Sequence, residues 1–265
     1  MSIEDHELAI AAAGAGATVV RARFGQQLSR VDKGAGDFAT EADIEAEKAI
    51  LEVLRAGRPA DAVLGEESGR TGSGERTWLV DPLCGTLNFA ARTTMVAVNV
   101  ALRSGPDILA AASADPFGEE VFWTGGAGAF RRHGGRDEPL LPSGGSRLVD
   151  LNLDPPFPSA PGFRAVNLLA DPEFGTAFSP RVLSTTLPLA WVAAGRRAGY
   201  LSDGHRDWTV HSAAGIALCR AAGCVVTDLS GEPLHSASRG LLAAADPRTH
   251  AAFLALITKT ANFRD

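Results

Sequence analysis

Residues 77–90 have the sequence TWLVDPLCGTLNFA, which combines an apolar strand with a polar turn. The run Trp-Leu-Val predicts a buried strand that ends at Asp81. Gly85 and Thr86 follow, and a Gly-Thr turn lets backbone N–H groups come close to a ligand. The stretch therefore presents a carboxylate and backbone N–H groups at the end of a strand, with Cys84 between them.

The composition narrows the class of protein. A chain of 265 residues is long enough for one large domain or two closely packed ones. A net charge of −6 argues against nucleic acid as a partner, because phosphate binding needs a surplus of Lys and Arg. The apolar runs are much shorter than the ~20 residues of a membrane span, so no membrane partner is expected. Cys84, Cys219 and Cys224 fit no disulfide framework, which predicts a reduced, cytoplasmic protein.

Local patterns predict several elements. A helix is expected over 4–30, where the small residues GAGA at 14–17 indicate close helix packing rather than a phosphate loop. Residues 33–43 are expected to form a loop, within which Thr40 is the N-cap of the next helix. The segment RRHGGRDEP at 131–139 is expected to be a polar turn.

The alternation of helical and strand-like patterns predicts an α/β (α+β) chain with a sheet in each half. Glycine- and proline-rich stretches between residues 143 and 160 indicate a boundary between two lobes. We therefore expect an N-terminal α+β lobe over 1–145 that carries most metal ligands. A C-terminal α/β lobe over 146–265 is expected to complete the site.

Acidic residues stand at the ends of several predicted elements. Asp43 opens a helix, the pair Glu66-Glu67 follows a short strand, and Asp81 follows another. Side chains at such turns converge at the ends of sheets, and gathered carboxylates bind hard cations such as Mg²⁺. Each residue alone is typical of an ordinary turn or a solvated loop. Their order along the chain is what indicates a common site.

Five segments carry a family resemblance: GDFATEAD, GEESG, WLVDPLCGTLNF, RVLSTTLPLAWVAAGRRAGYL and VHSAAGIALCRAAGCVVTDLSGEPL. In order and spacing they resemble the inositol monophosphatase superfamily, with its patterns D-x-x-T-x-x-D, G-E-E, W-x-x-D-P-x-D-G-T-x-N-F, R-x-x-G-[ST]-A-A and W-D-x-A-A-G. The resemblance implies a layered αβαβα sandwich of the inositol monophosphatase/fructose-1,6-bisphosphatase type, and a homodimer. It also implies a Mg²⁺-dependent, lithium-sensitive phosphomonoesterase that acts on a small phosphorylated polyol, sugar or nucleoside.

The resemblance assigns metal and catalytic roles to matching positions. Glu66, Asp81 and the Leu83 carbonyl match the ligands of the first metal. Asp43 matches the acidic residue near an outer, weakly held metal. Thr86 and Glu66 match the pair that activates the attacking water. Asp43, Glu66 and Thr86 are therefore the candidate catalytic residues.

Phosphate and substrate positions follow in the same way. Gly85 and Thr86 match the phosphate-binding turn of the superfamily. Ser184, Thr185 and Thr186 fall where it places substrate-contacting residues. Ser184 replaces the usual Gly, and this change is expected to narrow the substrate pocket.

Two departures affect the second metal position. Cys84 replaces the second Asp of the D-P-x-D-G-T motif, and His211 replaces the Asp of W-D-x-A-A-G, with Val210 in place of the Trp. Thiol and imidazole are poor ligands for Mg²⁺ but common ligands of Zn²⁺. A divalent metal is expected, Mg²⁺ from the resemblance, with Zn²⁺ or Mn²⁺ as alternatives because of these two residues.

Other interpretations of the altered pair stay open. The joint appearance of a Cys and a His favours a repurposed site, because a decayed site is expected to collect arbitrary residues. The alternative is a decayed site in which Cys84 is a small buried core residue and His211 a histidine at a helix start. Cys84 as a nucleophile with His211 as its base is a third hypothesis, ranked below metal binding because the resemblance directs both side chains to the cation. Asp207 is a further candidate for the missing carboxylate.

Overall fold

The structure is a computed structural model that describes residues 3–34, 37–154, 163–204, 209–234 and 240–262. It divides into two compact units, which we describe separately. Unit 1 comprises Met1–Pro139, Thr185–Leu187 and Thr209–Leu218, and unit 2 comprises Leu140–Ser184, Pro188–Trp208 and Cys219–Asp265. In the ranges described, no helix is long and apolar enough to cross a membrane.

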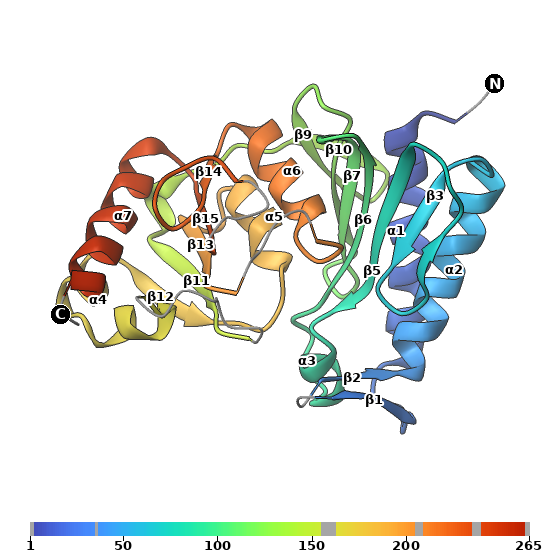
Figure 1. Ribbon diagram of the computed structural model, residues 1–265, viewed down its shortest axis with the longest axis horizontal. Helices are drawn as coiled ribbons and strands as arrows, with labels where there is room; N and C mark the ends of the chain where they lie inside the picture. The colour runs from blue at the N-terminus through green and yellow to red at the C-terminus, as the bar shows by residue number, and fades with distance from the viewer. Residues whose placement is uncertain (1–2, 35–36, 155–162, 205–208, 235–239, 263–265) are drawn as a thin grey trace. The chain divides into compact units, whose positions relative to one another are not determined.

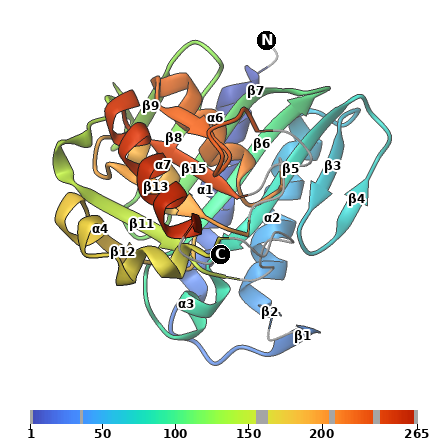
Figure 2. The same cartoon turned by 60° about the vertical axis from the view of Figure 1, so that its left-hand side comes forward.

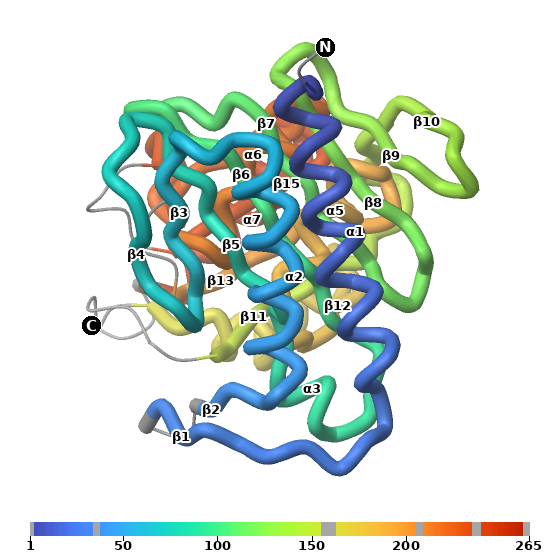
Figure 3. The backbone as a smooth tube through the Cα atoms, turned by 90° about the vertical axis from the view of Figure 1, so that its right-hand side faces the viewer, coloured from blue at the N-terminus to red at the C-terminus, as the bar shows by residue number. Residues whose placement is uncertain are grey.

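Unit 1 is built on a large sheet with two long helices on one of its faces (Figures 1 and 3). The strand order of this sheet is β10-β9-β8-β7-β6-β5-β3-β4, and β1 pairs with β2 as a separate hairpin. The strands of unit 1 are β1 (Arg30–Gly34), β2 (Asp37–Thr40), β3 (Ala62–Gly65), β4 (Gly69–Thr71), β5 (Arg76–Cys84), β6 (Ala97–Ser104), β7 (Asp107–Asp115), β8 (Glu120–Thr124), β9 (Ala129–His133) and β10 (Arg136–Pro139). Its helices are α1 (Asp5–Arg23), α2 (Glu41–Gly57) and the short α3 (Thr86–Ala90).

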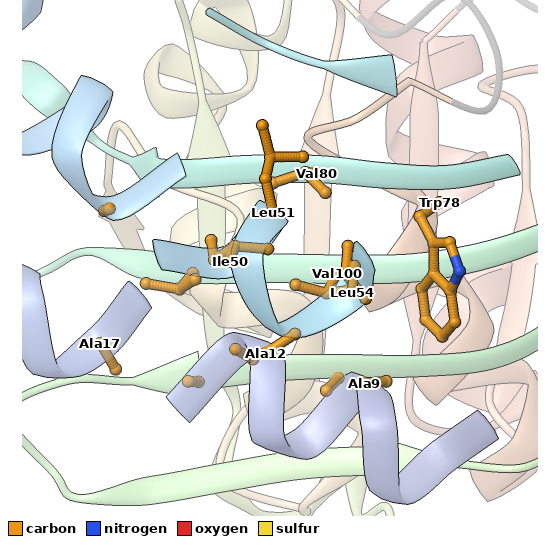
Figure 4. Close-up of a cluster of buried hydrophobic side chains, with 14 of the residues drawn as sticks. Ala9, Ala12, Ala17, Ile50, Leu51, Leu54, Trp78, Val80 and Val100 are labelled. Atoms are coloured by element: carbon orange, nitrogen blue, oxygen red, sulfur yellow. The ribbon is translucent and has the colours of Figure 1, made fainter. Parts of the chain in front are cut away.

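Small residues let α1 and α2 pack closely together and onto the sheet. A Cβ atom added at Gly16 would lie 2.7 Å from the Ile50 side chain of α2 and 2.9 Å from Val98 of β6. This contact confirms the expected packing role of the small-residue run at 14–17. Figure 4 shows Ile50 and Leu54 of α2 within the buried cluster that also holds Trp78, Val80 and Val100.

The alternation of side chains along the strands places a polar row on the opposite face of this sheet. Val80 and Val100 lie in the core beneath the helices, so their neighbours Asp81 and Asn99 point the other way. Asp81 pairs in register with Asn99, and Asn99 pairs with Ser113 on β7. This face therefore presents a row of three buried polar residues to the rest of unit 1.

Three local expectations are corrected. The first helix ends at Arg23 instead of residue 30, because Phe24 is extended and Gly25 has a φ of +76°. The expected loop at 33–43 instead includes the end of β1, the whole of β2 and the first turn of α2. The expected polar turn at 131–139 is the β9–β10 hairpin, in which Gly134 and Gly135 have positive φ and Arg132 faces Asp137 across the strands. Paired opposite charges explain why such a polar segment forms strands.

Unit 2 has a mixed sheet of five strands in the order β12-β11-β13-β15-β14. Strand β11 is parallel to β12 and β13, and β15 is antiparallel to β13 and β14. Its strands are β11 (Leu148–Asn152), β12 (Ser179–Val182), β13 (Gly199–Ser202), β14 (Val225–Thr227) and β15 (Leu241–Ala244). Its helices are η1 (Gly144–Ser146), η2 (Ala165–Ala170), α4 (Pro172–Ala177) and α7 (Pro247–Asn262).

A separate aromatic core holds unit 2 together. Helix α7 lies over β15 (Figure 2), and its Phe253 stacks on Phe178 with ring centroids 4.5 Å apart and also meets Phe174. Two helices, α5 (Leu187–Ala193) and α6 (Ala213–Ala222), each contribute residues to both units. The segments Thr185–Leu187 and Thr209–Leu218 thus return to unit 1, and this return matters for the site below.

Candidate active site

The end of β5 supplies Asp81, whose side chain is fully buried. The ladder between β5 and β6 is irregular between Asp81 and Cys84, where Pro82 has no N–H to donate. Asp81 Oδ1 accepts a hydrogen bond from the Leu83 backbone N–H at 3.2 Å, so the carboxylate itself stabilises the turn. Strand β5 continues beyond the predicted end at Asp81, because Cys84 still pairs with Ala97, and the turn that contains Gly85 follows.

Glu66 lies next to Asp81 because β3 and β5 are parallel neighbours. Gly65 pairs with Val80, and the Glu66 N–H donates to the Val80 carbonyl at 3.0 Å. Glu66 and Asp81 are thus the residues that come directly after the paired Gly65 and Val80. They lie side by side because parallel strands bring their carboxyl ends to the same edge of a sheet.

Glu47 of α2 secures the turn after Glu66. Its two carboxylate oxygens accept hydrogen bonds from the Glu67 and Ser68 N–H groups, each at 2.8 Å. A Cβ atom at Gly65 would lie 2.6 Å from this carboxylate, so only glycine leaves room for it. A buried acid with no expected role therefore shapes the turn that carries Glu66.

Asp43 and Thr86 form a direct pair. The N-cap Thr40 and Asp43 make a capping box, in which Asp43 Oδ2 accepts from the Thr40 N–H and hydroxyl at 2.8 and 2.6 Å. The other oxygen, Oδ1, accepts from the Thr86 hydroxyl at 2.8 Å, and this hydroxyl also lies 3.1 Å from the Leu83 carbonyl oxygen. The expected N-cap is confirmed, and the cap fixes the partner of Thr86.

The two altered residues gather around Asp81. His211 Nδ1 lies 2.9 Å from Asp81 Oδ2 and 3.8 Å from Glu66 Oε2. Ligand atoms of Asp81, Cys84 and His211 all lie within 4.8 Å of one another. Cys84 Sγ accepts from the Thr186 N–H at 3.2 Å and lies 3.0 Å from the Thr186 hydroxyl. Among the described residues, no hydrogen bond joins Cys84 to His211, so this geometry does not favour a nucleophile and base pair.

Lys33 of β1 adds a positive charge to the site. Its Nζ lies 3.0 Å from Glu66 Oε1 and 2.7 Å from Glu67 Oε1. Burial lowers the pKa of Lys33, but its bonds and attraction to these two carboxylates outweigh that effect and raise the pKa. The ammonium group is therefore charged and partly neutralises the carboxylates.

Burial and crowding shift the titration of the site. Burial and the charge of Asp81 raise the pKa of Glu66 to about 8, against the attraction of His211 and Lys33. Burial also raises the pKa of Asp43 and raises the pKa of Cys84 well above its ordinary value. Burial lowers the pKa of His211, but the Asp81 charge and hydrogen bond outweigh it and raise the pKa to about 9. Perturbed pKa values gathered in one place are typical of functional sites.

The expected substrate residues separate into two groups. Thr185 and Thr186 belong to unit 1, where both are buried. The Thr185 hydroxyl donates to the Cys84 carbonyl at 3.1 Å and accepts from the Leu187 N–H. Ser184 belongs to unit 2, where its hydroxyl donates to Asp154 at 2.6 Å. Asp207 lies outside the described residues.

Four residues of the site carried no recognised signal in the sequence: Lys33, Glu47, Asn99 and Ser113. Glu47 lies four positions after Asp43 on the same helix face, and this spacing is a usable signal. Asn99 and Ser113 interrupt strands that are otherwise apolar, and a polar residue at a buried strand position indicates a specific partner. Lys33 lies in a segment without periodic pattern, so its placement depends on the hairpin.

The donor atoms at the candidate metal positions differ in chemical kind. Glu66, Asp81 and the Leu83 carbonyl offer the oxygen ligands that Mg²⁺ prefers. At the second position the sulfur of Cys84 and the imidazole of His211 replace oxygen, and these donors suit softer ions such as Zn²⁺ or Co²⁺. The site is therefore chemically asymmetric.

The sequence profile of the inositol monophosphatase family matches residues 4–261. The chain belongs to the inositol monophosphatase family. It is 34% identical over 224 residues to an inositol-1-monophosphatase of Caulobacter vibrioides, an alignment that covers 78% of this chain and 82% of that protein.

Solved structures agree with this family. The extragenic suppressor protein suhB of Bartonella henselae superposes with a TM-score of 0.81 at 29% identity, covering 94% of this chain and 97% of that one. The inositol monophosphatase TM1415 of Thermotoga maritima gives a TM-score of 0.81 at 20% identity, covering 97% and 98%. The predicted fold class, that of inositol monophosphatase and fructose-1,6-bisphosphatase, is confirmed.

Proposed function

We propose that this family member is a divalent-metal-dependent phosphomonoesterase that acts on a small phosphorylated polyol, sugar or nucleoside. The observation that carries the proposal is the retained half of the site: Glu66 and Asp81 both reach the same nitrogen of His211, and the Thr86 hydroxyl is bonded to Asp43. Family membership supports phosphate ester hydrolysis.

Glu66, Asp81 and the Leu83 carbonyl would hold the first cation. When bound there, a divalent cation acts as a Lewis acid on a phosphate oxygen and lowers the pKa of water. The Thr86 hydroxyl donates a hydrogen bond to Asp43. Its oxygen therefore remains available to accept a hydrogen bond from the attacking water and to direct that water at phosphorus. Asp43, with its raised pKa, is suited to receive the proton that passes through the Thr86 hydroxyl. The Gly85 and Thr86 N–H groups are proposed to hold phosphate oxygens.

The second metal position is proposed to prefer Zn²⁺, Mn²⁺ or Co²⁺ over Mg²⁺. The support is the gathering of Cys84 and His211 beside Asp81. Affinity of sites with nitrogen and sulfur ligands rises toward the later transition metals.

A second candidate is a homologue that binds a small phosphorylated ligand without hydrolysing it. Lys33 lies between Glu66 and Glu67, and His211 lies on Asp81. The side chains of Lys33 and His211 thus supply positive charge to the carboxylates in the place of a metal ion. A site neutralised in this way still attracts phosphate through Lys33 and backbone N–H groups.

The deciding experiment measures phosphate release by purified protein from inositol 1-phosphate, a sugar bisphosphate and a 3′-phosphonucleotide. Each substrate is tested with Mg²⁺, Mn²⁺, Co²⁺ or Zn²⁺ as the added ion. We expect release with at least one pair, and Asp81→Asn should abolish it while the protein still folds. Asp107→Asn, an exposed acid of β7, is the matched control. Binding of these esters with no release in any pair supports the second candidate.

The double variant Cys84→Asp with His211→Asp separates an altered site from a decayed one. In an altered site, the reversion should destroy the native activity or shift its metal preference to Mg²⁺, and each single variant should already be impaired. In a decayed site, the reversion should create Mg²⁺-dependent hydrolysis in a protein that has none.

Assembly and location complete the proposal. We expect a cytoplasmic homodimer with no nucleic-acid or membrane partner, on the basis of the family resemblance and the net charge of −6. Light scattering of the purified protein measures the mass, for which twice the chain mass of 27.5 kDa is the expected result.

A further inference from the structure

A chain of buried polar groups lies directly behind the two altered residues of unit 1. Asn99 and Ser113 are each 1% exposed and pair in register on β6 and β7. The Ser113 hydroxyl is 2.8 Å from Asn99 Oδ1, and Asn99 Nδ2 is 3.0 Å from the Thr186 hydroxyl and 3.3 Å from the His211 carbonyl oxygen. The Asn99 amide thus contacts both the backbone of His211 and the side chain of Thr186, and Thr186 in turn contacts Cys84.

The His211 carbonyl determines the orientation of the Asn99 amide. The His211 carbonyl can only accept, so the NH₂ group of Asn99 must face it and Oδ1 must face Ser113. The second proton of the NH₂ group goes to the Thr186 hydroxyl. That hydroxyl also lies 3.0 Å from Cys84 Sγ, in a contact in which either atom can be the donor.

Cys84 Sγ thus makes two hydrogen bonds with one residue: it accepts from the Thr186 N–H at 3.2 Å and shares a second bond, of 3.0 Å, with the Thr186 hydroxyl. A thiolate has no proton to give, so in the metal-bound form the hydroxyl becomes the donor and both bonds point at the sulfur. Two donors aimed at a sulfur hold it as an acceptor and leave its remaining lone pairs for another electrophile. Hydrogen bonds to the ligand atoms of a metal site orient those ligands and tune the affinity. Packing alone requires no such pair of donors, because a buried thiol satisfies itself as a small apolar group.

We infer that Asn99 is a positioning residue: through Thr186 and through the His211 backbone, it presents the Cys84 sulfur and the His211 imidazole to a thiophilic divalent cation beside Asp81. This inference rests on the altered second metal position of the proposed function. It adds the residues that select the softer ion. It also assigns the Cys84 sulfur to metal binding rather than to nucleophilic attack.

The test titrates the metal-free, full-length protein with Co²⁺ and follows the near-ultraviolet charge-transfer absorption of a thiolate bound to Co²⁺. We expect the band in the natural protein and its loss in Cys84→Ser. Thr186→Val removes one donor to sulfur and should weaken Co²⁺ binding about 10- to 100-fold. Thr186→Ser keeps the hydroxyl and should bind as the natural protein does.

Controls separate positioning from folding. Thr77, which lies on β5, is also a buried threonine, and Thr77→Val should leave the Co²⁺ affinity unchanged. Asn99→Ala should weaken Co²⁺ binding more than Thr186→Val, because it also releases the His211 carbonyl, and thermal melting without metal reports whether it folds. If it does not fold, the comparison of Thr186→Val with Thr186→Ser decides alone.

Two results would overturn the inference. One is the absence of the band in the natural protein while Mg²⁺ supports phosphate release, a result that leaves the proposed function intact. The other is equal Co²⁺ affinity in Thr186→Val and Thr186→Ser. A Co²⁺ band that depends on Thr186, in a protein that hydrolyses none of the esters with any ion, supports the inference and contradicts the phosphatase proposal.

Discussion

At the scale of single residues, the site holds two largely buried carboxyl groups, those of Glu66 and Asp81, next to each other. Glu66 lies beside Asp81, and among the residues that the structure describes Lys33 and His211 offset the two carboxylates. Burial disfavours the charged form of a carboxyl group, and a neighbouring like charge disfavours it further. Without a cation, Glu66 therefore holds its proton into the neutral pH range, where its pKa is about 8. A divalent cation removes that penalty, so binding and deprotonation are coupled.

The pH dependence of stability follows from this shift. The pKa of Glu66 is raised from 4.5 to about 8 in the fold, so its stabilising contribution is complete below 4.5 and is lost as pH rises through about 8. His211, raised from 6.5 to about 9, contributes in full below 6.5 and loses its contribution as pH rises through about 9. We expect urea midpoints of the metal-free protein to fall over this range, and to fall less in Glu66→Gln. An equal decline in both proteins would contradict the assignment.

Glu47 permits a second prediction at this scale. Glu47→Gln keeps the shape but leaves one of the Glu67 and Ser68 N–H groups without its acceptor oxygen. An unsatisfied buried group costs about 1–3 kcal/mol of unfolding free energy. Urea denaturation should show this loss, together with weaker metal binding as the Glu66 turn loosens. Glu52→Gln, an exposed position on the same helix, is the control and should change neither quantity.

At the scale of elements, helix α2 holds two of the candidate catalytic residues, Thr86 and Glu66, in place through its own side chains. The residues of its first turn both cap the helix and hold Thr86, because Asp43 uses one oxygen for each task. Glu47, one turn later on the same face, holds the Glu66 turn. Helix α2 thus positions both Thr86 and the turn that carries Glu66. A change in its first turn is therefore expected to move both.

Removing the cap tests this link. Thr40→Ala should lower the free energy of unfolding by about 1 kcal/mol, as loss of an N-cap usually does, and should also reduce kcat because Asp43 loses one of its donors. Thr40→Ser should keep both properties near their natural values. Asp171→Ala removes the N-cap of α4 in unit 2, so it should lower stability without lowering kcat. A normal kcat in Thr40→Ala would show that the cap and the site are independent.

At the scale of the whole molecule, the site is completed by chain that returns from far along the sequence. Thr186 and His211 belong to unit 1, although the continuous part of that unit ends at Pro139. These two returning segments contact Cys84, Asp81 and Asn99 through Thr186 and His211. The gathering of these side chains therefore depends on parts of the chain that lie far apart in the sequence.

Truncation makes this a measurable statement. A fragment of residues 1–139 lacks the partners of Cys84 and of the buried Asn99 amide, which leaves polar groups unsatisfied. We expect it to unfold at lower urea concentration than the full chain and to show no thiolate charge-transfer band with Co²⁺. The full chain under the same conditions is the reference. A fragment that binds Co²⁺ through Cys84 as tightly as the full chain would contradict the role of the returning segments.

Several features follow from local sequence alone. The apolar run before Asp81 and the Thr40 cap are decided by neighbouring residues, because strand burial and helix capping depend on contacts within a few positions. The left-handed Gly85, with a φ of 107°, is a further example, since few other residues adopt that conformation. The family resemblance likewise rests on short motifs whose spacing is visible in one dimension.

The tertiary structure decided what joins these motifs. No periodicity predicts that Lys33 meets Glu66, that Asn99 reaches the His211 carbonyl, or that Thr186 contacts the Cys84 sulfur through both its N–H and its hydroxyl. Such contacts join residues up to 112 positions apart, and they depend on strand register and on the return of two segments to unit 1. The sequence by itself determined that Cys84 and His211 replace the acidic residues of the family patterns. The fold alone decided that the replacements converge, because convergence requires long-range packing that no local pattern encodes.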